Sequence, residues 1–210
     1  MNIWNKYNWR TSLLVACSYG NEVIVKYLIE HGANMNSSND NEETPLIIAC
    51  DRGNEAIVKC LVEHGANINK EDIDGQTPLY IACSSGNEDI VKYLVEHGAN
   101  INKVGLTPLD GACLCGKEAI FKYLIKRGAY IDQITLFYAC RSGNEAIVKY
   151  LVEHGTNVNK EHWNGSMPLF KACSSGNEAI VKYLVELGAD INKINKDGET
   201  SLFYCMFRWR

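Results

Sequence analysis

A segment of thirteen residues recurs along this chain, and the repetition strongly limits the folds open to it. Five copies, of which GNEAIVKCLVEHG and GNEAIVKYLVEHG are typical, lie at 20–32, 53–65, 86–98, 143–155 and 176–188, and a looser copy, GKEAIFKYLIKRG, lies at 116–128. A leucine recurs with spacings of 33, 33, 30, 27, 33 and 33 residues, at Leu13, Leu46, Leu79, Leu109, Leu136, Leu169 and Leu202. A period near 33 residues predicts a stacked repeat protein.

Each repeat carries the start and stop signals of two short helices. Thr44-Pro45 and Thr77-Pro78 combine a capping hydroxyl with a proline at the first helical position, and that helix is expected to end at the glycine of Gly-Asn-Glu. The second helix is expected to begin at Asn-Glu, to end before a capping glycine and to bury one apolar face, formed in one copy by Ile57, Val58, Leu61 and Val62. The asparagine-rich link that follows should form a turn or hairpin that projects from the stack. These signals predict an all-α fold.

Three motifs together resemble those of the ankyrin repeat family. They are Thr-Pro-Leu-x-x-Ala, the Gly-Asn-Glu-Ala-Ile-Val start of the second helix, and Gly-Ala-Asn-Ile-Asn at 65–69 and 98–102. The resemblance covers about residues 6–210, as a single array over 1–210 of about seven units anchored at the seven leucines, the last one incomplete. It implies an all-α solenoid of L-shaped helix pairs with hairpin fingers. It also implies a scaffold that binds a protein partner, without catalysis and without a cofactor.

One position departs from the family pattern. Ankyrin repeats commonly have histidine directly after Thr-Pro-Leu, whereas this chain has Leu14, Ile47, Tyr80, Asp110, Phe137, Phe170 and Phe203. We therefore expect apolar contact to replace most of the polar link between neighbouring turns. On the second helix, Lys59 and Glu63 are four residues apart and are expected to form a weak surface pair.

Composition and charge exclude several other classes of protein. The chain has 210 residues, 46% of them hydrophobic and 22% charged, and its net charge of −4 provides no basic surface for nucleic acid or for a membrane. No apolar run approaches the roughly 18–20 residues that a membrane span needs. The first residues, MNIWNKYNWR, lack the apolar stretch of a signal peptide, so a cytoplasmic location is expected.

Six of the nine cysteines occupy the same Ala-Cys dipeptide, at Cys17, Cys50, Cys83, Cys113, Cys140 and Cys173. Copies in neighbouring units should lie roughly 8–10 Å apart, the spacing of packed helices. That exceeds the limit of about 7 Å between Cα atoms for a disulfide. We therefore expect buried, reduced cysteines and a reducing, intracellular compartment. Two glycosylation triplets, at Asn36 and Asn164, argue weakly the other way.

The repeated segment also contains side chains capable of acid–base chemistry. Residues copied into every unit form a series along the array, whereas a catalytic site needs one convergent cluster. His31, His64, His97 and His154 precede a capping glycine, where a cation suits the helix C-terminus, and the repeated tyrosines are expected to pack between units. Outside the series, a catalytic or metal site could use only Cys113-x-Cys115, Cys60 and His162, which is a weak pattern.

The resemblance to ankyrin repeats implies that the recognition surface is the concave face, formed by the finger tips and the exposed residues of the first helices. These positions vary between units here, whereas the second helices are nearly constant. Because Trp and Arg dominate binding hot spots, Trp163 and the Trp9–Arg10–Tyr19 group are preferred contacts, although Trp4, Trp9 and Trp209 could instead cover the ends of the stack. The full set of candidate contacts is Trp9, Arg10, Tyr19, Asp51, Arg52, Ile73, Asp74, Gln76, Leu114, Arg141, Trp163 and Asn164.

Two further features concern the outline of the array. The spacings of 30 and 27 residues place deletions in the fingers before Leu109 and Leu136, and the second finger should be nearly absent, which leaves a notch. The last unit ends in TSLFYCMFRWR, whose apolar side chains lack a second helix to cover them. Either the chain belongs to a longer array, or residues 203–210 are a docking surface, for a partner or for self-association.

Overall fold

The structure is a computed structural model and describes residues 11–203. The chain divides into two compact units, whose described parts are residues 11–111 and 112–203. We call them the N-terminal and the C-terminal unit and describe each by itself. Across the described range the secondary structure consists of short helices, and the one strand-like contact is an isolated bridge between Ile194 and Thr200. No helix in this range is long and apolar enough to cross a membrane.

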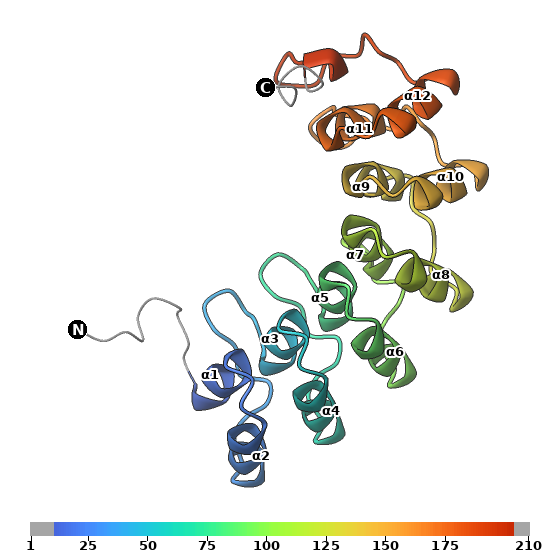
Figure 1. The fold of residues 1–210 in the computed structure, drawn as a ribbon. Helices are drawn as coiled ribbons and strands as arrows, with labels where there is room; N and C mark the ends of the chain where they lie inside the picture. The colour runs from blue at the N-terminus through green and yellow to red at the C-terminus, as the bar shows by residue number, and fades with distance from the viewer. Residues whose placement is uncertain (1–10, 204–210) are drawn as a thin grey trace. The chain divides into compact units, whose positions relative to one another are not determined.

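The N-terminal unit contains three complete helix pairs and the start of α7 (Pro108–Cys115). In each pair an odd-numbered first helix is followed by an even-numbered second helix. The first helices α1, α3 and α5 pack side by side, and α2, α4 and α6 form a second row beside them (Figure 1). The bounds are α1 Ser12–Ser18, α2 Glu22–Glu30, α3 Pro45–Asp51, α4 Glu55–Glu63, α5 Pro78–Ser85 and α6 Glu88–Glu96.

The C-terminal unit repeats this arrangement with the end of α7 and five further helices (Figure 1). First helix α9 packs against α11, while second helix α10 packs between α8 and α12. The bounds are α8 Glu118–Lys126, α9 Thr135–Ser142, α10 Glu145–Glu153, α11 Pro168–Ser175 and α12 Glu178–Glu186. Helical structure begins again at 201–203. The helix pairs confirm the predicted all-α repeat fold.

Local signals in the sequence account for the helix ends. The hydroxyl of Thr44 accepts a hydrogen bond from the backbone N–H of Ile47 at 3.3 Å, and Thr77 caps α5 in the same way, at 3.2 Å from the N–H of Tyr80. Gly86 ends α5 in the left-handed conformation, with φ of 78°, which a residue without Cβ adopts at least cost. Met167 replaces the capping threonine of α11, which therefore lacks a side-chain cap.

The recurring leucines form the core of both units. All are buried except Leu202, whose side chain is 64% exposed. The residues that follow them, where the family commonly has histidine, are buried as expected at Leu14, Ile47, Tyr80, Phe137 and Phe170. Asp110 is also buried, and its carboxylate accepts hydrogen bonds from the hydroxyl and the backbone N–H of Thr107, at 2.8 and 3.2 Å.

Asparagine side chains connect neighbouring repeats. The Oδ1 of Asn144 caps α10 by accepting from the N–H of Ile147 at 3.1 Å, while its Nδ2 donates to the carbonyl of Gly116 in the preceding repeat at 2.8 Å. Asn177 forms the same two bonds one repeat later, and Asn54 does so in the N-terminal unit. Hydrogen bonds between repeats are therefore present, both at the start of the second helices and in the fingers, where the N–H of Ile73 donates to the carbonyl of Asn41 at 2.9 Å.

The prediction of an ion pair between Lys59 and Glu63 is wrong. The ammonium of Lys59 lies 2.5 Å from the carboxylate of Glu55 instead. Glutamate four residues before lysine is the better order on a helix, because each charge then faces the favourable end of the helix dipole.

The finger lengths follow the spacing of the leucines. The connections 31–44, 64–77 and 154–167 are long, 97–107 is shorter, and 127–134 is the shortest between consecutive repeats. Asp132 closes the shortest one by accepting a hydrogen bond from the N–H of Ile134 at 3.1 Å. The shortening predicted before Leu136 is therefore present.

Candidate functional site

In the N-terminal unit the candidate contact residues lie on the fingers and at the ends of first helices. Tyr19 and Ile73 are 75% and 65% exposed. Asp51 and Arg52 are also exposed and lie next to each other, with 3.9 Å between the Nε of Arg52 and a carboxylate oxygen of Asp51. Asp74 is exposed and Gln76 is half-buried. The predicted contacts Trp9 and Arg10 lie outside the described residues.

Three of the described fingers close on an Asn or Asp seven residues before the recurring leucine. Asp72 is typical: its carboxylate accepts from the backbone N–H groups of Asp74 and Gln76, at 3.0 and 2.8 Å. Asn39 and Asn195 form the same pair of bonds in their own fingers. Such a side chain holds the tip in one conformation, so the residues at the tip are presented on a rigid turn.

The finger 154–167 is built differently, because His162 occupies the position of Asp72. Its backbone N–H still donates to the carbonyl of Ser166, at 2.8 Å, but the bond to the N–H of Ser166 now comes from the side chain of Asn164, at 3.1 Å. The imidazole lies 3.3 Å from the side-chain oxygen of Asn164 and stacks on Phe137 of α9, with ring centroids 4.5 Å apart. This finger therefore carries an aromatic contact to the preceding repeat.

The stacked pair is the centre of a cluster of aromatic and basic side chains. The rings of Tyr138 and Trp163 lie with their centroids 6.4 and 5.4 Å from that of His162. The ammonium of Lys171, on α11, lies 5.1 Å from the centre of the Phe137 ring. We call Phe137, Tyr138, Arg141, His162, Trp163 and Lys171 the Trp163 cluster. Trp163 is 77% exposed, so a large apolar side chain projects from it into solvent.

Positive charge is concentrated in the Trp163 cluster. Burial lowers the pKa of Lys171, and the nearby guanidinium of Arg141 lowers it further. Burial also lowers the pKa of His162, a hydrogen bond to Asn164 opposes that shift, and the charge of Lys171 adds to it. Between residues 11 and 203, no carboxylate forms an ion pair with Lys171 or Arg141.

The structure thus brings together part of the predicted set. Arg141 and Trp163 belong to the cluster, and Asn164 supports it from within the finger. Leu114 is half-buried on α7 and has no described contact with the cluster. Sequence reasoning missed the roles of His162 and Lys171, although both break a pattern: Lys171 is the one charged residue found two positions after a recurring leucine.

Comparisons with known proteins agree with this architecture. The family model described as "Ankyrin repeats (3 copies)" matches residues 1–72, 70–135 and 136–208. The chain belongs to the ankyrin repeat family. The crystal structure of the human ASB11 ankyrin repeat domain is similar to it, with 30% sequence identity, a TM-score of 0.74, and coverage of 93% of this chain and 91% of that one. No protein with a curated description matches the chain.

The repeated histidines and tyrosines of the ankyrin repeats contact each other within single helices. The Nδ1 atoms of His31, His97 and His154 lie 2.7 to 2.8 Å from the carbonyl oxygen four residues earlier, and each ring stacks on the tyrosine at that position. These tyrosines therefore pack against a histidine of their own helix, in addition to any contact between units. Tyr150 also contacts the preceding repeat, through the edge of Phe121.

Burial disfavours the thiolate form of several described cysteines. Cys60 lies 3.9 Å from the imidazole of His64, but burial raises the pKa of its thiol, which keeps it protonated. Burial raises the pKa of Cys17 and Cys140 to about 12. Among the described residues, no group of three or more His, Cys, Asp or Glu could hold a metal ion.

Cys173 corrects the prediction of reduced cysteines. It is disulfide-bonded, whereas Cys17, Cys50, Cys60 and Cys140 are free thiols. The spacing argument excluded disulfides only between copies of the Ala-Cys dipeptide in neighbouring repeats. The chain also contains Cys205, which stands outside that dipeptide series and outside the described residues.

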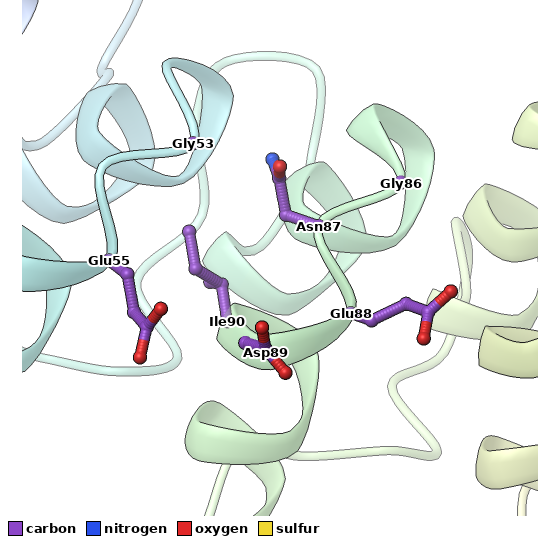
Figure 2. Close-up of a pocket in the computed structure, with 7 residues that line it drawn as sticks. All are labelled: Gly53, Glu55, Gly86, Asn87, Glu88, Asp89 and Ile90. Atoms are coloured by element: carbon purple, nitrogen blue, oxygen red, sulfur yellow. The ribbon is translucent and has the colours of Figure 1, made fainter.

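A hollow in the N-terminal unit lies between the starts of α4 and α6. Figure 2 shows its lining, formed by Gly53, Glu55, Gly86, Asn87, Glu88, Asp89 and Ile90. Glu55 is paired with Lys59, and Asp89 lies 3.6 Å from Lys92. The Nδ2 of Asn87 donates to the carbonyl of Cys50 at 3.2 Å. Glu55 and Asp89 are thus paired within their own helices, while Asn87 joins its repeat to the preceding one.

Proposed function

We propose that this ankyrin array is a non-catalytic scaffold that binds a partner protein through its finger tips and first helices, the concave face of the family. The observation that carries the proposal is the exposure of Tyr19, Ile73 and Trp163 on these elements. They are large apolar side chains at positions that differ from repeat to repeat, whereas the second helices are nearly constant. Exposed aromatic residues of this kind form the anchors of protein interfaces.

The proposal is tested by measuring the affinity of partners captured from the cells that make the protein. Three variants are compared: Tyr19→Ala with Ile73→Ala, Trp163→Ala alone, and Val185→Ala as the control on exposed α12 surface. Loss of an anchor should weaken binding by about 2 kcal/mol, or roughly thirtyfold. A partner that binds all three variants as it binds the parent chain would refute the proposed face.

Self-association is a second candidate function. Leu202 and Phe203 are exposed apolar residues at the limit of the described residues, and Phe203 begins the segment 203–210, for which a docking surface is one of the two predicted alternatives. A concentration-dependent dimer in light scattering, lost when residues 203–210 are removed, is the expected result for this candidate. The reducing, intracellular compartment stays a prediction.

A further inference from the structure

Among residues 112–203, the Trp163 cluster is the one place where two cations on first helices lie close together without a carboxylate ion pair. Arg141 lies five residues after its recurring leucine. The matching residues in the N-terminal unit are Ser18, Asp51 and Ser84, and the carboxylate of Asp51 lies 3.9 Å from Arg52. Among the described ion pairs, by contrast, none includes Arg141 or Lys171, and each of the two raises the electrostatic potential at the other.

Lys171 is held by packing. Lys171 is half-buried, and its ammonium lies 5.1 Å from the centre of the Phe137 ring, on which the imidazole of His162 stacks with 4.5 Å between ring centroids. Partial burial lowers the pKa of Lys171 and of His162, so an uncompensated positive charge here is costly. An anion that binds beside Lys171 would relieve that cost, and the contact would be shielded from solvent on one side.

The finger supplies an apolar anchor next to the charges. Trp163 is largely exposed, and the tip that carries it is fixed by the bond from Ser166 N–H to Asn164 and by the bond from Lys196 N–H to the carbonyl of Asn164, at 3.1 and 3.0 Å. The nearest acidic residue in sequence, Glu161, is already paired with Lys193 at 2.6 Å. The site therefore offers positive charge and one large apolar contact, and its own neighbouring carboxylate does not compete for the cations.

We propose that the Trp163 cluster binds an acidic segment of the partner protein, with an Asp or Glu carboxylate at Arg141 and Lys171 and an apolar or aromatic side chain against Trp163. This rests on the proposed function and specifies the chemistry of the partner. A carboxylate forms charge-assisted hydrogen bonds with both cations, and charge complementarity of this kind selects the partner and its register. The short finger 127–134 leaves this part of the face without a long finger of its own repeat.

The test is selection of random linear peptides displayed on phage against the immobilised full chain. We expect the selected peptides to be enriched in Asp and Glu beside an aromatic or branched apolar residue. Their affinity should fall at least about tenfold in the double variant Arg141→Ala, Lys171→Ala, and it should also fall as salt is raised. The charge-reversed variant Arg141→Glu, Lys171→Glu should select Lys and Arg instead.

The control makes the same change in net charge on the second helices, through Lys149→Glu with Lys182→Glu, two exposed lysines of α10 and α12. It should still select acidic peptides. No enrichment, enrichment without a charge preference, or equal binding by the Arg141→Ala, Lys171→Ala variant overturns the inference. Peptides that depend on Tyr19 or Ile73 instead also overturn it but leave the proposed function standing, whereas the partner-capture experiment tests that function separately. Circular dichroism verifies that each variant is folded.

Discussion

The imidazole of His162 lies parallel to the phenyl ring of Phe137, with 4.5 Å between the ring centroids and an interplanar angle of 2°. The two residues belong to consecutive ankyrin repeats and are 25 positions apart in the chain. The contact exists because a histidine stands where other fingers have an Asn or Asp that closes the turn. The contact fixes the finger that presents Trp163. Protonation of His162 should therefore affect both the stability of the unit and the binding of a partner.

His162 should make the stability of the C-terminal unit depend on pH. Its pKa is lowered from 6.5 by burial, so the folded chain binds a proton less readily than the unfolded chain. Stability is therefore complete above the unfolded pKa and decreases as the pH falls from about 7 to about 5. Hydrogen exchange at these two pH values should show earlier opening of α9 and α11 at the lower one. His162→Gln should remove the difference in these helices, and its persistence would contradict this role.

Leu136→Ala should destabilise the C-terminal unit first. Leu136 is fully buried, so the truncation leaves a cavity and should cost about 2–5 kcal/mol of unfolding free energy. Damage in a repeat array spreads to neighbouring units, so exchange protection should fall in α8 to α11 before α1 to α4. Leu202→Ala is the matched control, since this leucine is exposed and its loss should change stability by less than about 0.5 kcal/mol. Uniform loss of protection along the chain in Leu136→Ala would disagree with this picture.

Asn144 allows the capping bond and the bond between repeats to be separated. Asn144→Ala removes both and should cost about 1–3 kcal/mol, whereas Asn144→Ser keeps a capping oxygen and should cost about 0.5–1.5 kcal/mol through loss of the bond to Gly116. Urea unfolding of the two variants measures the difference. Equal stability of Asn144→Ser and the parent chain would show that the bond between repeats contributes nothing.

Gly111→Ala should destabilise the chain although alanine is the better helix former. A Cβ on Gly111 would lie 2.8 Å from the carbonyl oxygen of Tyr80 and 3.3 Å from the Cβ of Cys83, so backbone would have to move. Overpacking of this kind costs about 1–3 kcal/mol, more than the gain in helix propensity of about 1 kcal/mol. Chemical unfolding measures whether the substitution lowers or raises the free energy of unfolding. A more stable Gly111→Ala variant would mean that α7 does not approach α5 this closely.

Local chemistry made most of the ankyrin fold predictable. Thr44, Pro45 and the repeated glycines mark helix ends through conformational preferences that act within a few residues, and the recurring leucines define the core. Asn144 was readable as a cap, but its second bond depends on the position of the preceding repeat. Gly111 likewise owes its role to a contact with another helix.

The candidate site was predictable only in part. Trp163 and Arg141 stand out because they fall at variable, exposed positions. The sequence indicates His162 only as a weak metal or catalytic candidate, and its stacking on Phe137 follows from the packing of one finger against the preceding repeat. The expectation for Cys173 was wrong because the spacing argument covered only cysteines that share one register.

The most direct test of the account is photocrosslinking in the cells that make the protein. Benzoylphenylalanine is placed at Trp163 on the finger in one variant and at Val185 on α12 in the other. Both positions are exposed, so the two variants differ in the face that carries the probe. The account predicts a discrete crosslinked partner from position 163, weakened by Arg141→Ala with Lys171→Ala, and none from position 185. The same crosslinked partner from position 185 but not from position 163 would contradict it.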